Sequence, residues 1–113
     1  MRRVLVETFT HDGYDVYAVA DGAALLIELA RNHRFHYDTV DVVVADVRMP
    51  LCSGIQALET IRSLRPKLPF VLLTAFGDKE MHARAASLRA ELLDKPVSMK
   101  RVKAAVASAI ENR

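Results

Sequence analysis

The run of residues at positions 41–50, Asp-Val-Val-Val-Ala-Asp-Val-Arg-Met-Pro, constrains the fold more than any other stretch of the chain. It leads through consecutive apolar residues to a carboxylate, Asp46. A continuous apolar run without alternation is typical of a strand covered on both faces, as in a parallel sheet between helices. Reacting groups gather just beyond the carboxyl ends of such strands. We therefore predict a buried strand with Asp46 at its functional end; the alternative is that Asp46 is an ordinary turn residue.

The composition points to one ordinary globular domain. The chain has 113 residues, so we expect a single domain over residues 1–113 with no separate output domain. The formal net charge is +2 and the basic residues are scattered, so no direct contact with nucleic acid is expected. Cys52 is the only cysteine, which excludes an intrachain disulfide and favours a reducing compartment. No signal-peptide pattern or membrane-spanning run is present, so we expect a cytoplasmic protein without membrane contact.

Apolar periodicity divides the chain into alternating helices and strands. The first dozen residues have helical spacing, although a short strand at residues 4–6 is a competing interpretation. Asp21, Asp78 and Ser98 stand where helix N-caps are expected. We predict strands at residues 14–20, 41–45, 70–74 and 91–94, and helices at residues 1–12, 21–30, 55–64, 78–88 and 98–109. This order is typical of a doubly wound α/β domain with right-handed crossovers.

Three of the predicted strands end in residues capable of chemistry, which are Asp46, Thr74 and Lys95. Because the carboxyl ends of parallel strands share one edge of the sheet, we expect these side chains to meet there. The set suits phosphoryl transfer: the carboxylate attacks phosphorus, the ammonium neutralises phosphoryl oxygens and the hydroxyl hydrogen-bonds one of them. Taken singly, Thr74 could be a plain strand residue and Lys95 a solvated charge. The ordered set of three favours a site.

These residues resemble the receiver domain of response regulators in two-component signalling. The resemblance implies a flavodoxin-like doubly wound parallel sheet and a signalling module rather than an enzyme. It also implies a sensor histidine kinase or histidine phosphotransfer protein as phosphodonor, and a downstream protein target. The matching segments are residues 41–54 with Asp46, Met49, Pro50 and Gly54, residues 71–75 with Thr74 and Ala75, and Lys95-Pro96.

The resemblance also implies a role for each site residue. Asp46 corresponds to the phosphoacceptor, Thr74 to the hydroxyl that moves toward the phosphoryl group, and Lys95 to the ammonium that pairs with it. The bond between Lys95 and Pro96 is commonly cis in the family, a form that prolyl bonds adopt at little cost. Arg48 would lend its backbone carbonyl to a Mg²⁺ ion that Asp46 also binds.

The chain departs from the family at its start. The usual first strand and its acidic pair are missing, so we expect a truncated sheet with four strands instead of five. Asp46 and one carbonyl should then bind Mg²⁺ weakly or not at all, and phosphorylation should be slow or absent. The strands at residues 14–20 and 41–45 would either pair directly or leave an unpaired edge that favours a homodimer.

Two further departures concern the last strand. Leu92 stands three positions before Lys95, where the family usually places an aromatic residue, which puts the usual relay from Thr74 in doubt. Residues 87–90, Ser-Leu-Arg-Ala, lack the usual glycine before that strand.

Two alternatives to a working phosphoreceiver stay open. In the first, the chain is a receiver-like interaction module in which Asp46, Thr74 and Lys95 form a structural ion-pair and hydrogen-bond group. In the second, it is a phosphatase of a different α/β fold with an aspartyl nucleophile. The second has less support, because such enzymes usually need a second acid near the nucleophile, and Arg48 occupies the nearest such position.

Overall fold

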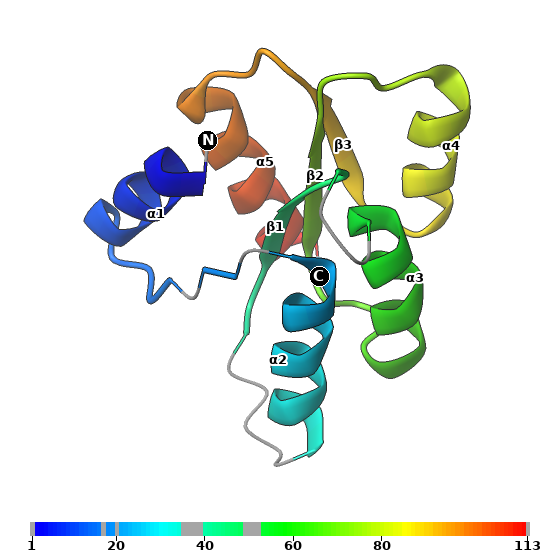
Figure 1. Ribbon diagram of the computed structural model, residues 1–113. Coiled ribbons are helices and arrows are strands. Elements are labelled where there is room, and N and C mark those ends of the chain that lie inside the picture. The colour runs from blue at the N-terminus through cyan, green and yellow to red at the C-terminus, as the bar shows by residue number, and fades with distance from the viewer. Residues whose placement is uncertain (1, 17, 20, 35–39, 49–52, 113) are drawn as a thin grey trace.

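A computed structural model describes residues 2–16, 18–19, 21–34, 40–48 and 53–112, with the side chains of residues 31–34 left out. In this part of the chain, helices alternate with short strands after an initial helical pair (Figure 1). The elements are α1 (Arg2–His11), α2 (Gly22–Arg34), β1 (Val43–Asp46), α3 (Gly54–Leu64), β2 (Phe70–Thr74), α4 (Lys79–Ser87), β3 (Glu91–Asp94) and α5 (Met99–Glu111).

The three strands form one parallel sheet in the order β1-β2-β3. Asp46 lies opposite Leu73, and Thr74 lies opposite Asp94, so the carboxyl ends of all three strands meet at one edge. The predicted parallel sheet is therefore confirmed. Asp46 and Thr74 end two neighbouring strands, and Lys95 directly follows the third.

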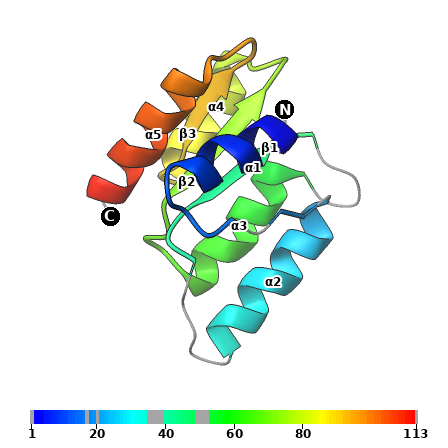
Figure 2. The ribbon, with the colours of Figure 1, turned by 90° about the vertical axis from the view of Figure 1, so that its left-hand side faces the viewer.

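Helices cover both faces of the sheet, as the doubly wound prediction requires (Figures 1 and 2). Every side chain of β2 is buried. Because successive strand residues point to opposite faces, Phe70 and Leu72 pack into one layer and Val71 and Leu73 into the other. The first layer includes Leu29, Leu58, Ile61 and Leu92, and the second includes Phe9, Leu93, Val102, Ala105 and Val106.

Short polar side chains begin the helices as predicted. Asp78 accepts a hydrogen bond from the Met81 N–H and Ser98 from the Arg101 N–H, so both act as N-caps. Asp21 accepts from the Ala24 N–H at 2.7 Å. Our prediction missed the cap of α3, where Ser53 and Gln56 form a capping box. The Ser-x-x-Gln spacing was visible in the sequence and is a recognised start signal.

The predicted strand at residues 14–20 is wrong for its described positions, because residues 14–16, 18 and 19 form no strand. The described chain therefore has three strands, where four were predicted. Tyr14 and Val16 have strand-forming side chains, but a strand also needs hydrogen bonds from a neighbour, and no described strand pairs with this segment.

A cavity of about 650 Å³ lies between this segment and the sheet. It is lined by residues from α1, α2, the 13–19 segment and the outer edge of β1. Figure 2 shows α1 in front of the strands, with α5 on one side and α2 on the other. The edge of β1 that does not pair with β2 therefore faces an open space.

The link between α4 and β3 takes an unusual backbone conformation at Arg89. Its φ is +57°, in the left-handed region that favours glycine. This conformation explains why a glycine was expected in the link before the last strand. Arg62 of α3 holds the link by donating to the Leu88 carbonyl at 2.7 Å and to the Arg89 carbonyl at 3.2 Å. Burial, together with the nearby charge of Arg89, lowers the pKa of Arg62.

No helix in the described ranges is long and apolar enough to cross a membrane.

Candidate functional site

Asp46 is the last residue of β1, and its position is fixed by the elements on either side. The Val47 N–H donates to the Leu73 carbonyl at 2.8 Å, which continues the ladder to β2 just past Asp46. The Gly54 N–H donates to the Val47 carbonyl at 2.9 Å and ties the start of α3 to the same point. The carboxylate is thus presented from a rigid strand end.

Lys95 pairs with Asp46 across the sheet edge. Its Nζ lies 2.5 Å from Asp46 Oδ1, and both side chains are about two-thirds buried, with exposed fractions of 29% and 33%. Asp46 Oδ1 is itself buried, and no donor in the described part of the chain forms a well-aligned hydrogen bond with it. The contact is therefore an ion pair by distance rather than by hydrogen-bond angle.

The Lys95-Pro96 peptide bond is cis, as the resemblance implied. The Lys95 N–H donates to the Thr74 carbonyl at 2.6 Å, so the residue after β3 is held against the end of β2.

Thr74 ends β2 and is buried, with 4% of the residue exposed. Its Oγ1 accepts a hydrogen bond from the Phe76 N–H at 3.2 Å, so the hydroxyl is held by the turn that follows the strand. The structure gathers Asp46, Thr74 and Lys95 at one edge of the sheet, with Lys95 in direct contact with Asp46.

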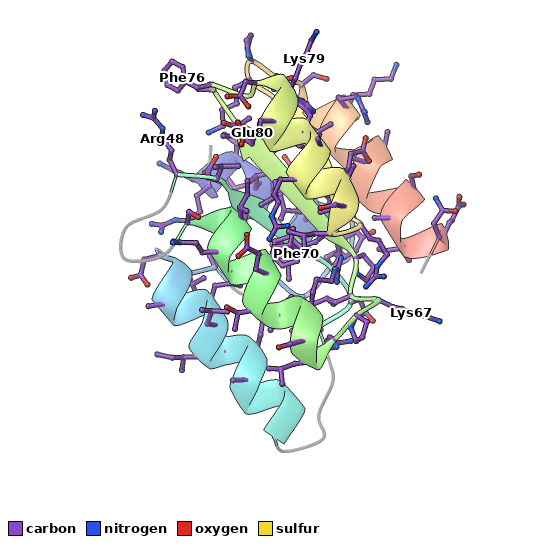
Figure 3. All side chains as sticks on the ribbon, turned by 90° about the vertical axis from the view of Figure 1, so that its right-hand side faces the viewer. Arg48, Lys67, Phe70, Phe76, Lys79 and Glu80 are labelled. Atoms are coloured by element: carbon purple, nitrogen blue, oxygen red, sulfur yellow. The ribbon has the colours of Figure 1, made fainter. Side chains whose placement is uncertain are left out.

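Arg48 lies beyond Asp46 with its side chain exposed. Its guanidinium carbon stacks over the ring of Phe76, 4.6 Å from the ring centroid (Figure 3). Met49, Pro50 and Cys52, which were part of the sequence pattern, lie outside the described residues. Phe76 could not be recognised from the sequence, because an exposed aromatic residue after a strand does not indicate which side chain it contacts.

A second polar pair lies next to Thr74 and Lys95. His82 of α4 and Asp94 of β3 are joined at 2.8 Å between Nε2 and Oδ2. Gly77 fits beside them, because a Cβ there would meet Asp94 Oδ1, Thr74 Cγ2 and His82 Nε2. This pair could not be recognised from the sequence, since His82 and Asp94 come together only when α4 packs on β3.

Few oxygen ligands for Mg²⁺ lie near Asp46 among the described residues. Mg²⁺ prefers six oxygen ligands, of which proteins usually supply one or two carboxylates. No group of three His, Cys, Asp or Glu residues in the described part of the chain is placed to hold a metal ion. Asp46, the carboxylate that ends β1, is already paired with Lys95.

Comparison with known proteins places these features in one family. The family model described as "Response regulator receiver domain" matches residues 1–107. A solved receiver-domain protein from Clostridium thermocellum aligns with a TM-score of 0.87 and 27% identity over 98% of this chain and 86% of that chain. The Borrelia burgdorferi CheX-CheY-BeF3-Mg complex includes a chain that aligns with a TM-score of 0.81 and 25% identity, over 94% and 78%.

Proteins of similar sequence are also regulators of this kind. Transcriptional regulatory protein PdtaR of Mycobacterium tuberculosis is 35% identical over 88% of this chain and 46% of its own length. Chemotaxis protein CheY of Treponema pallidum is 30% identical over 93% of this chain and 72% of its own length. This chain spans 17% of regulatory protein AtoC of Escherichia coli, which is 33% identical over 75% of this chain. Several of these relatives are thus considerably longer than the stretch they share with this chain.

Proposed function

Because this chain belongs to the response-regulator receiver family of two-component signalling, we propose that it accepts a phosphoryl group on Asp46 and signals through contacts with other proteins. The observation that carries the proposal is the ion pair between Asp46 and Lys95 at the carboxyl edge of the sheet. This pair places a nucleophile beside a cation, as phosphoryl transfer to a carboxylate requires.

In the proposed reaction, a carboxylate oxygen of Asp46 attacks the phosphorus of a phosphohistidine. A bond forms between that oxygen and phosphorus while the bond from phosphorus to the imidazole nitrogen breaks. The electron pair leaves with the imidazole, which takes up a proton. Lys95 offsets the charge of the phosphoryl oxygens, and the Thr74 hydroxyl donates a hydrogen bond to one of them.

A weakly held Mg²⁺ would be bound by Asp46 and the Arg48 carbonyl. When bound, it would offset the negative charge of the phosphoryl group. With few protein ligands, we expect a high Mg²⁺ requirement and slow phosphorylation.

The proposed partners follow from the family. A sensor histidine kinase or histidine phosphotransfer protein would supply the phosphoryl group, and a downstream protein would read it. We further propose that the module works in the cytoplasm as a signalling domain rather than an enzyme, without binding nucleic acid or membrane itself. A homodimer formed through the open edge of β1 is part of the same proposal.

Intact mass spectrometry tests the assignment of Asp46. After incubation with Mg²⁺ and acetyl phosphate, we expect the mass of one phosphoryl group to be added to a fraction of the protein. Asp46→Asn should remove this signal, because an amide is a poor nucleophile, and Lys95→Ala should slow its appearance. A phosphoryl group retained in Asp46→Asn would contradict the site.

A second candidate function is a receiver-like interaction module that is never phosphorylated. It is favoured by the small number of metal ligands around Asp46 in the described residues. In that case no phosphoryl mass should appear in the wild type. Lys95→Ala should then chiefly lower the free energy of unfolding, because it leaves a mostly buried carboxylate without its partner.

A further inference from the structure

A contact between two loops joins the residues that follow Asp46 and Thr74. Arg48 stands two residues after Asp46 and stacks over Phe76, which stands two residues after Thr74. Figure 3 shows the two labelled side chains together at one end of the molecule. Phe76 is 65% exposed, so burial does little to hold its ring. A cation stacked on an exposed ring changes the equilibrium between the held and the free ring about two- to five-fold. The contact with Arg48 therefore restrains the Phe76 ring where burial does not.

The backbone of Phe76 connects this contact to Thr74. The Phe76 N–H donates to Thr74 Oγ1 at 3.2 Å, while the Lys95 N–H fixes the Thr74 carbonyl at 2.6 Å. With its main chain fixed, Thr74 can redirect its hydroxyl only by rotating about the Cα–Cβ bond. That rotation breaks the hydrogen bond from Phe76.

Among the described aromatic residues, Phe76 is the one hydrogen-bonded to Thr74 and so is placed to respond to such a change. Leu92, three residues before Lys95, is 7% exposed and packs in the core. Phe76 is directly hydrogen-bonded to Thr74 and its ring faces solvent. A rotation of Thr74 would thus be transmitted to an exposed aromatic ring beside the site.

We propose that Arg48 and Phe76 are positioning residues for Thr74 and that a phosphoryl group on Asp46 releases them. The release step rests on the function proposed above. Guanidinium groups pair with phosphate through two parallel hydrogen bonds, which are stronger than stacking on a ring. The new negative charge on Asp46 therefore draws Arg48 away from Phe76. The turn at residues 75–77 loosens, and the Thr74 hydroxyl exchanges the Phe76 N–H for a phosphoryl oxygen.

The positioning half is tested by NMR on the unphosphorylated protein. Amide hydrogen exchange at Phe76 and three-bond couplings to the Thr74 methyl group report the hydrogen bond and the χ1 rotamer. In Arg48→Gln and in Phe76→Leu we expect exchange at Phe76 to accelerate about two- to five-fold, with mixed χ1 rotamers at Thr74. Arg48→Lys should give a smaller effect, because an ammonium also stacks on the ring.

Two further variants distinguish a specific effect on the hydrogen bond between Phe76 and Thr74 from a general loss of stability in the domain. Lys67→Gln removes the same charge at the opposite end of the molecule and should change neither signal (Figure 3). Thr74→Val removes the acceptor, so exchange at Phe76 should be fast, and adding Arg48→Gln should accelerate it no further. Unchanged exchange in both Arg48→Gln and Phe76→Leu would overturn the positioning role. The positioning role would also be overturned if Arg48→Gln accelerated exchange at Phe76 as much in the Thr74→Val variant as in the wild type.

The release half is tested after treatment with acetyl phosphate and Mg²⁺, with the phosphorylated fraction measured by intact mass. In phosphorylated wild type the Thr74 hydroxyl no longer accepts from the Phe76 N–H, so exchange at Phe76 should rise above the level of unphosphorylated Arg48→Gln and approach that of Thr74→Val. Exchange unchanged in phosphorylated protein would overturn the release while leaving the proposed function intact. If no phosphoprotein forms, the release falls with the proposed function, whereas the positioning role is still decided by the unphosphorylated protein.

Discussion

At the residue scale, two glycines shape the surroundings of the site in different ways. A Cβ on Gly54 would lie 2.5 Å from the Asp46 carbonyl oxygen and 2.9 Å from Leu72 Cδ2. Both obstacles belong to the strands that build the site, and one of them is backbone. A Cβ on Gly77 would meet the end of the Asp94 side chain first and would lie 3.0 Å from Thr74 Cγ2 and 3.1 Å from His82 Nε2, so its closest obstacle is a flexible side chain that can rotate away. The same substitution should therefore have unequal costs at the two positions.

We predict that Gly54→Ala lowers the free energy of unfolding by about 1–3 kcal/mol, the usual cost of overpacking a tight site. Because α3 must move away from the end of β1, this variant should also slow phosphorylation at Asp46. Urea unfolding and intact mass measure the two effects. Gly77→Ala serves as the matched control and should cost less. Equal losses in both variants would contradict the distinction between backbone and side-chain obstacles.

At the scale of elements, Arg62 joins α3 to the link between α4 and β3. Its guanidinium donates to the carbonyls of Leu88, Arg89 and Arg65. One planar group thus satisfies three carbonyls, including that of Arg89 in its left-handed conformation. Only the fork geometry of arginine can span them, since the lysine ammonium is a single point charge.

We expect Arg62→Met to lower the free energy of unfolding by at least about 1.5 kcal/mol, the lower range for a hydrogen bond to a charged group. Thermal or urea unfolding measures the loss. Arg62→Lys keeps the charge without the fork and should recover only part of it. Full recovery in the lysine variant would show that charge rather than geometry holds the link.

At the scale of the whole molecule, the outer edge of β1 has no strand paired with it in the described part of the chain. The N–H groups of Val43 and Val47 donate toward β2, to the Pro69 and Leu73 carbonyls. Because alternate residues of a strand point their backbone groups in opposite directions, the N–H and C=O of Val44 face the cavity beside β1. An apolar strand with such an edge favours pairing with another chain.

We predict that the chain self-associates, so that its weight-average mass in sedimentation equilibrium rises with concentration. Val44→Pro should reduce this association, because proline removes an edge donor without touching the hydrogen bonds to β2. Ala45→Pro, which should break the ladder to β2, is the contrasting variant and is expected to unfold the domain. A monomer mass for the wild type at every concentration would contradict the prediction.

The sequence alone was enough to locate the three strands of the described sheet and the polar residues at their carboxyl ends. The continuous apolar runs before Asp46 and Thr74 predicted buried parallel strands, because only a strand covered on both faces needs apolar residues at consecutive positions. Asp21, Asp78 and Ser98 marked helix starts, because an N-cap depends on the local backbone and on few distant contacts.

Tertiary structure decided the features that depend on contacts between distant segments. Residues 14–20 have strand-like composition, yet their described positions form no strand, because pairing needs a neighbour that composition cannot reveal. Arg48 contacts Phe76, 28 residues later in the chain, and Arg62 contacts Leu88, 26 residues later. His82 contacts Asp94, 12 residues later. Local patterns thus determined which residues form the strands and caps, whereas packing determined how the residues around Asp46 are held.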